Sequence, residues 1–304
     1  MQCRGFLLIV FCSVLTACGS KSTERTYPVQ GQVIAVTPDR REATIKHAEI
    51  KGLMPAMTMP YKFREKADLD TVKPGDVIDA TLVIVENDAY LTNVKRLGEA
   101  PLELPPAEAA VVASSGFELL KPGEAVPDSP FLDQDGKKKT FRAFRGSTVV
   151  LTFIYTKCPL PTFCPLMDRH FVTLQEHLQD DPALKNVHLV TVSFDPITDT
   201  PAVLKKHART LKADLTRWTF LTGDRDDVDR FAARFGVSVS RALSDARDIT
   251  HNLRTAIISP EGTLVKVYTG NEWTPNEILA DLKPTANARI WSSRHLVISS
   301  SFLN

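Results

Sequence analysis

The sequence predicts a small all-β barrel of the OB type followed by an α/β domain. Between residues 28 and 98, short runs of alternating apolar and polar residues are separated by turn signals, and about five short strands in such a stretch suit a closed barrel. Between residues 116 and 283, apolar β-branched runs alternate with helical periods, which indicates a layered α/β fold. Residues 99–115 are rich in Pro, Ala and Glu without periodicity, and we expect a linker there.

The first 17 residues have the features of a secretory leader. A polar start with Arg4 precedes an apolar run from Phe6 to Val14, and about twelve apolar residues are too few to span a bilayer core of roughly 30 Å. The sequence Leu15-Thr16-Ala17-Cys18 resembles a bacterial lipoprotein box, which implies that Cys18 becomes the lipidated N-terminus and that Cys3 and Cys12 are removed. Residues 18–27 then form a tether. The alternative is an ordinary signal that leaves Cys18 as a spare thiol.

Charge and compartment narrow the function classes. The 37 basic and 36 acidic residues nearly cancel, so the composition gives no sign of a nucleic-acid partner. The leader indicates an extracytoplasmic, periplasmic-side location with lipid attachment to the membrane. There an isolated thiol pair is oxidised unless a reductant or a metal protects it. Cleavage leaves Cys158 and Cys164 as the only cysteines besides Cys18, which favours redox or metal chemistry for this pair.

The predicted barrel strands follow from local alternation and from the turns between them. Turn signals stand at Thr37-Pro38-Asp39, at Pro74-Gly75-Asp76 and at Glu86-Asn87-Asp88. The clearest predicted strands are Val33–Val36, Ala43–His47, Val77–Val85 and Tyr90–Leu97.

The α/β region is predicted to begin with a hairpin at Asp135-Gly136 and to continue as alternating strands and helices. Thr200-Pro201 has the order of a helix start, and Gly236 follows a helix as a C-cap candidate. The predicted strands are 148–155, 187–194, 219–221, 255–259 and 263–268. The predicted helices begin at Pro165, Pro201, Asp224 and Pro275, and residues 284–304 form a tail without a usable pattern.

The pair Cys158 and Cys164 lies at a strand-to-helix junction. Because the helix begins at Pro165, its N-terminal N–H groups and dipole favour a thiolate at Cys164. Six Cα steps could extend to roughly 20 Å, whereas a disulfide needs Cα atoms within about 7 Å, so the loop must fold back. Pro159 and Pro161 favour a fixed bend. Two such thiols could close a disulfide, structural or redox-active, or bind one Cu(I) ion.

A second candidate metal site is a methionine cluster, Met54-Pro-Ala-Met57-Thr-Met59. In a strand, Met57 and Met59 point to the same face, so both thioethers can converge on one ion. His47 adds an imidazole if its strand pairs with theirs. Thioether and imidazole together favour Cu(I) or Ag(I). The alternative is that the methionines only fill the core of a small barrel.

Three ordered motifs resemble the Sco/SenC family of thioredoxin-like copper proteins, over about residues 115 to 283. They are Thr148–Met167, Ser193–Pro201 and Thr250–Gly262. The resemblance implies a thioredoxin fold in which Cys158, Cys164 and His251 bind copper, as Cu(I) or Cu(II), with Asp195 and Asp199 in a nearby acidic motif. It also implies a role in assembling the dinuclear copper centre of cytochrome c oxidase, or in keeping the cysteines of that centre reduced.

One departure from the family and two alternatives accompany this resemblance. The usual family motif has three residues between the cysteines, whereas this chain has five, Pro159–Phe163. His251, taken alone, could be an ordinary surface histidine. Asp195 and Asp199 could serve as turn and cap residues, since Asp-Pro and Asp-Thr-Pro are common signals of that kind.

The N-terminal region resembles the CusF-like periplasmic copper-binding domain. The resemblance runs from Ala43–His47 through Met59 and on to Val72–Asp76. It implies His47, Met57 and Met59 as copper ligands. The best-known form carries a tryptophan over the metal, and here Met54 takes that place as a shield or a fourth donor. The chain's tryptophans are all distant in sequence: Trp218, Trp273 and Trp291.

Two different soft-metal sites on one chain favour transfer over storage. We therefore expect a lipid-anchored copper chaperone in which the barrel collects Cu(I) and the α/β domain passes it to an apo-cuproprotein such as an oxidase subunit. A linker of about eighteen residues spans roughly 20–25 Å, which places each site near the other at about millimolar effective concentration. The alternatives are a thiol–disulfide reductase acting through Cys158 and Cys164, and a buffer for copper or silver tolerance. The sequence leaves open whether the chain is an enzyme.

Overall fold

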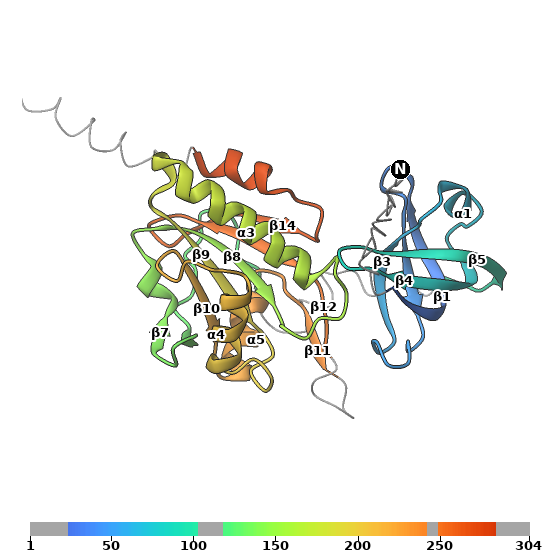
Figure 1. Cartoon of the computed structure of the whole chain (residues 1–304), viewed down its shortest axis with the longest axis horizontal. Helices are drawn as coiled ribbons and strands as arrows, with labels where there is room; N and C mark the ends of the chain where they lie inside the picture. Colours follow the sequence, from blue (N-terminus) through green and yellow to red (C-terminus); the bar gives the residue numbers. More distant parts are fainter. Residues whose placement is uncertain (1–23, 103–117, 242–248, 284–304) are drawn as a thin grey trace, which may run out of the picture.

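The computed structural model describes residues 24–102, 118–241 and 249–283, which form two lobes, each built on its own sheet (Figure 1). The predicted leader with Cys3 and Cys12, the lipidation site Cys18, most of the predicted linker and the tail 284–304 lie outside the described residues.

The N-terminal lobe is an antiparallel sheet of five strands in the order β3-β2-β1-β4-β5. The bounds are β1 (Arg25–Thr37), β2 (Glu42–His47), β3 (Met57–Lys62), β4 (Asp76–Ile84) and β5 (Ala89–Glu99), with a 3-10 turn at Pro38–Arg40 and a short helix α1 (Lys66–Asp70). A bridge from Phe63 to Leu91 joins the end of β3 to β5, so the sheet closes toward a barrel as predicted. Because β1 already begins at Arg25, the end of the predicted tether is strand.

The close approach of β1 and β2 beside His47 requires a glycine. Gly31 is the register partner of His47, and a Cβ atom at Gly31 would lie 2.6 Å from Ile45 Cγ2 and 2.7 Å from the Lys46 carbonyl oxygen. No side chain fits there, so the backbone of β1 lies directly against the strand that carries His47.

The C-terminal lobe has a mixed sheet of seven strands in the order β14-β13-β8-β9-β10-β6-β7. The bounds are β6 (Pro130–Asp133), β7 (Lys138–Thr140), β8 (Thr148–Ile154), β9 (Val187–Ser193), β10 (Trp218–Thr222), β13 (Arg254–Ile258) and β14 (Leu264–Thr269). Strands β8, β9 and β10 are parallel, and the others pair antiparallel. A separate two-stranded ribbon, β11 (Val239–Arg241) and β12 (Ile249–His251), was not predicted.

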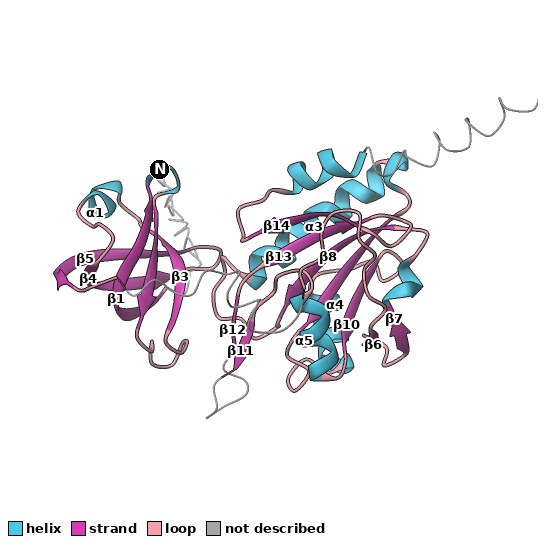
Figure 2. Ribbon diagram, turned by 180° about the vertical axis from the view of Figure 1, so that it is seen from behind, coloured by secondary structure: helices cyan, strands magenta, loops and turns pink. Residues whose placement is uncertain are grey.

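Helices cover both faces of this sheet. Helix α3 (Cys164–Asp180) and a helix at residues 275–283 lie on one face, and α4 (Pro201–Thr210) and α5 (Arg225–Ala233) lie on the other (Figures 1 and 2). Short 3-10 helices occupy Phe141–Phe144 and Pro182–Leu184. The predicted cap at Thr200 is present, since its side chain accepts from the Val203 N–H. None of the helices in the described ranges has both the length and the apolar character needed to cross a membrane.

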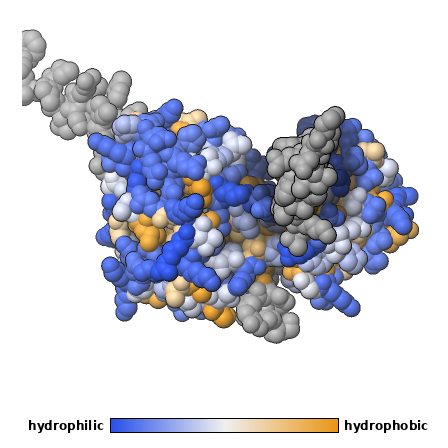
Figure 3. Space-filling view, in the orientation of Figure 1, coloured by the Kyte–Doolittle hydropathy of each residue, from blue (hydrophilic) through white to orange (hydrophobic). Residues whose placement is uncertain are grey.

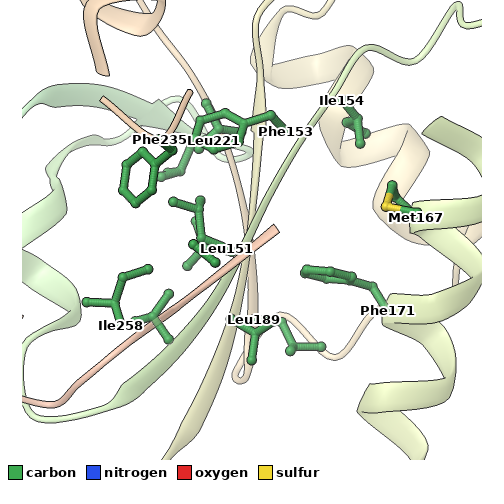
Figure 4. Close-up of a cluster of buried hydrophobic side chains, with 14 of the residues drawn as sticks. Leu151, Phe153, Ile154, Met167, Phe171, Leu189, Leu221, Phe235 and Ile258 are labelled. Carbon is green, nitrogen blue, oxygen red and sulfur yellow. The ribbon is translucent and has the colours of Figure 1, made fainter. Parts of the chain in front are cut away.

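The core of the C-terminal lobe is built on β8. Every residue of β8 is buried, as expected for a strand covered on both faces. Because side chains alternate along a strand, Leu151 and Phe153 lie on one face of β8 and Ile154 lies on the other. Ile154 lies near Met167 of α3 in the buried cluster of Figure 4. The face of the molecule shown in Figure 3 is mainly hydrophilic with small apolar patches. The packed β8 fixes the point from which the cysteine loop departs.

Candidate metal centres

Three elements bring the predicted sulfur and imidazole donors of the C-terminal lobe together. Cys158 lies in the loop after β8, Cys164 is the first residue of α3, and His251 ends β12. The Cys164 Sγ atom lies 3.6 Å from His251 Nε2. Two donors bound to one ion at about 2.0 and 2.3 Å, the distances known for zinc, stand about 3.5–3.7 Å apart. The observed spacing therefore fits two ligands of a single ion.

The tautomer of His251 is set by its own backbone. Its Nδ1 lies 2.9 Å from the carbonyl oxygen of Asn252, so Nδ1–H donates there and Nε2 keeps its lone pair toward the sulfur. Two aromatic rings hold the imidazole, since the centroid of Tyr155 lies at 5.5 Å edge-on and that of Phe194 at 4.5 Å. Neither ring was identified from the sequence, because aromatic residues in apolar strands do not stand out from ordinary core residues.

The two thiols differ in acidity. A hydrogen bond from the Cys164 thiol, together with His251, holds the pKa of Cys158 well below its usual range. Burial raises the pKa of Cys164 well above its usual range, since its side chain is only 1% exposed. The expectation of a thiolate at Cys164 is therefore wrong. Desolvation outweighs the helix N-terminus, and the lowered pKa favours Cys158 over Cys164 as the thiolate.

The acidic pair supports the cysteine loop and does not face the donors. The Asp199 carboxylate accepts from Thr156, at 2.9 Å from the N–H and 2.5 Å from the hydroxyl, and from the Ser193 hydroxyl at 2.6 Å. Burial raises the pKa of Asp199. Asp195 closes the following turn by accepting from the Thr198 N–H at 3.2 Å. The structure thus places Asp195 and Asp199 as turn and positioning residues.

The methionine cluster and His47 share the inner face of the N-terminal sheet. Strands β2 and β3 pair as expected, with His47 opposite Met57 and Ile45 opposite Met59. Met59 and Met54 are buried, and Met57 is half-buried. The three thioethers and the imidazole therefore gather at one end of the β2–β3 pair.

The backbone sets the tautomer of His47 in the same way as that of His251. Its Nδ1 lies 2.6 Å from the Ala48 carbonyl oxygen, so Nδ1–H donates and Nε2 keeps the lone pair. His47 is 2% exposed, and among the described residues its Nε2 has no hydrogen-bond partner. Burial lowers the pKa of His47, which keeps the ring neutral. A buried nitrogen lone pair without a donor is the state that a soft cation would complete.

Aromatic shielding at this site differs from the tryptophan of the best-known form. Tyr61 packs edge-on against His47, with ring centroids 5.6 Å apart and planes at 80°. Trp218 and Trp273 are buried in the other lobe, and Trp291 lies outside the described residues. No tryptophan of the described residues therefore covers the methionines.

Part of each donor set lines a single cleft of about 190 Å³, whereas the buried His47 and Cys164 are not among its lining residues. Its lining includes residues from both lobes: Met54, Met57, Met59, Cys158 and His251. In the ranges that the structure covers, no three His, Cys, Asp or Glu side chains stand close enough to hold an ion as they are. A bound ion would draw Cys158 closer to Cys164 and His251, or recruit a methionine thioether. The linker length indicated that the two sites come within reach of each other, but the sequence did not indicate that they share a cleft.

Two family models match the chain. The SCO1/SenC model matches residues 121–287, more than half of the chain, and the model described as copper binding periplasmic protein CusF matches residues 26–96. The SCO1 protein homolog of Bacillus subtilis (strain 168) is 29% identical over 161 residues, which covers 52% of this chain and 81% of the relative.

Solved structures give similar matches. A SCO1/SenC family lipoprotein from Bacillus anthracis str. Ames is 27% identical and covers 56% of this chain and 99% of that chain, with a TM-score of 0.49. BsSco, described as a member of the Sco family of cytochrome c oxidase assembly proteins, is 29% identical with the same shares and a TM-score of 0.47. The chain belongs to the SCO1/SenC family, with a CusF-like region ahead of its thioredoxin-like part.

Proposed function

We propose that the chain is an extracytoplasmic, lipid-anchored copper chaperone that binds Cu(I) and delivers it to an apo-cuproprotein. We take the CuA centre of cytochrome c oxidase as the acceptor. Membership of the SCO1/SenC family and the match to a copper-binding CusF model support this function. The apolar leader and the lipoprotein box ending at Cys18 support export and anchoring.

Two imidazoles whose Nε2 atoms lie beside sulfur carry the proposal. His251 Nε2 lies 3.6 Å from Cys164 Sγ, and His47 Nε2 is buried without a partner among the described residues beside Met57. Imidazole with thiolate or thioether selects Cu(I) over hard cations such as Mg²⁺ and Ca²⁺. Because a thiolate carries charge and a thioether does not, the ion moves from the methionines toward the cysteines.

Anaerobic Cu(I) titration of the full chain against a competing chelator tests this function. We expect two equivalents. Met57→Leu with Met59→Leu removes one, and Cys158→Ser with Cys164→Ser removes the other. Met167→Leu is the matched control, because Met167 is buried in the C-terminal core. This variant should still bind two equivalents of Cu(I). No copper uptake by the wild-type chain, or uptake unchanged in both double variants, contradicts the proposal.

A second candidate function, thiol–disulfide reduction, is favoured by the opposite pKa shifts of the two cysteines. The Cys158 thiolate would attack a partner's disulfide and release one partner thiolate. Cys164 would then lose its proton and attack Cys158 Sγ, which releases the second thiolate and leaves a Cys158–Cys164 disulfide. Two electrons pass to the partner, and an external dithiol must restore the pair. A copper-free chain that reduces a model disulfide but takes up no Cu(I) favours this candidate.

A further inference from the structure

The loop Pro159–Phe163, between the two cysteines, lies between the lobes. Leu160 is only 6% exposed and belongs to the cluster of buried residues of the N-terminal sheet, which includes Ile45 and Met59. Phe163 and Cys158 pack against the cores of both lobes. Figure 1 shows this part of the chain extending from β8 toward the N-terminal sheet. A side chain of the cysteine loop thus completes the core of the other lobe.

Polar contacts fix the loop at its outer side. The Arg169 guanidinium donates to the Pro161 carbonyl oxygen at 2.9 Å and reaches the Asn87 carbonyl oxygen of the N-terminal lobe at 3.5 Å. The Asn271 amide donates to the Thr162 carbonyl oxygen at 2.8 Å. The neighbouring Glu272 pairs with Arg40 of the N-terminal lobe. The loop is therefore braced by the C-terminal lobe in the position in which Leu160 enters the N-terminal core.

Leu160 and Phe163 also divide the space between the lobes. Both line the cleft of about 190 Å³ that the methionines and Cys158 also line. Both line a second cavity of about 220 Å³, on the side of Tyr61 and Glu272. The donor cleft is bounded by these two side chains on one side and by the methionines on another.

We propose that the loop Pro159–Phe163 is an intramolecular docking element that seats the CusF-like region over the cysteine site. Copper then passes between the two donor sets inside one cleft, and an external acceptor reaches Cys158 only after the lobes separate. This proposal rests on the proposed chaperone function. The transfer is a ligand exchange without electron transfer, so the ion stays Cu(I). Each Cu–thioether bond that breaks is replaced by a Cu–thiolate bond, the Cu–His47 bond is replaced by a Cu–His251 bond, and the Cys164 proton leaves to solvent.

Alkylation of Cys158 in the full chain tests the docking. A bulky maleimide is the probe, and peptide mass spectrometry separates Cys158 from the other cysteines. We expect Leu160→Asp to react at least tenfold faster than the wild type and to show a larger radius of gyration by small-angle X-ray scattering, because a carboxylate cannot enter the apolar core. Ile197→Asp is the matched control, since Ile197 is 56% exposed on the same lobe, and it leaves both measurements unchanged.

Leu160→Ala covers the case in which Leu160→Asp does not fold, and it should react faster than wild type by a smaller factor. Equal alkylation rates and equal radii in wild type and Leu160→Ala overturn the docking, even if copper binds as expected. A wild-type chain that takes up no Cu(I) but still shows the Leu160 effects overturns the chaperone function and leaves the docking in place.

Discussion

His47 and His251 reach the same chemical state through the same local contact, although they belong to different folds. In each, Nδ1–H donates to the carbonyl oxygen of the next residue along the chain, Ala48 or Asn252. The backbone thereby chooses the tautomer, and no second side chain is needed to leave Nε2 free for an ion. Only the three-dimensional backbone shows this, since any residue could follow the histidine in sequence.

The buried Nε2 of His47 is expected to lower stability in the absence of metal. A buried polar atom without a partner costs about 1–3 kcal/mol, and His47 Nε2 has none among the residues described. His47→Leu should therefore raise the free energy of unfolding of the copper-free chain by about 1 kcal/mol while abolishing Cu(I) binding at the methionines. Urea denaturation and Cu(I) titration measure the two effects. A destabilised variant that still binds Cu(I) with full affinity would show that the histidine is structural.

The acidity of the cysteines shows where local sequence rules fail at this scale. The position of Cys164 at the start of α3 was predictable, and that position favours a thiolate. Its burial against the C-terminal core was not predictable, because it depends on residues distant in sequence. The pKa of Cys158 is lowered chiefly by a hydrogen bond from Cys164, whose own pKa burial raises.

At the scale of single elements, the pairing of β9 with β10 contains a titratable group. His188 on β9 contacts the Thr219 hydroxyl on β10 at 2.8 Å, and burial, helped by Lys139 and Arg217, lowers the pKa of His188 from 6.5 to about 4. Between these two values the unfolded chain binds a proton that the folded chain does not. Stability therefore falls as pH decreases from about 6.5 to about 4, and outside that window His188 adds nothing to the pH dependence.

His188→Gln should remove this dependence. Across this window we expect the wild-type chain to lose about 2 kcal/mol of its free energy of unfolding, a figure reduced because His188 is partly exposed. The variant should have a flatter stability profile between pH 6.5 and pH 4. Chemical denaturation at a series of pH values measures it. The control is His177→Gln, which changes an exposed histidine on α3 and should keep the wild-type profile. Parallel profiles for His188→Gln and wild type would contradict the assignment.

Elements with a strong local pattern were predictable, and short ones were not. The continuous apolar run of β8 and the cap at Thr200 identified a buried strand and a helix start, and both are present. Strands β11 and β12 have three residues each, too few to show a period. Yet β12 carries His251, so only the family motif indicated this ligand candidate.

At the scale of the whole molecule, the meeting of the two sites could not be predicted. Met57 and Cys158 are separated by about a hundred residues in sequence, and no local pattern sets the distance between them. The five-residue spacing of the cysteines appeared in the sequence as a departure from the family. In the structure the same loop places Leu160 in the core of the N-terminal lobe.

The shared cleft has a consequence for occupancy. Two monovalent cations bound on either side of one cleft of about 190 Å³ repel each other, and this repulsion is strong where little water screens it. Loading should therefore be anticooperative: the second stepwise affinity of the wild-type chain falls below that of either site measured alone in the matching double variant. Such a molecule binds one ion tightly and a second ion more weakly, and the arrival of the second ion speeds the dissociation of the first.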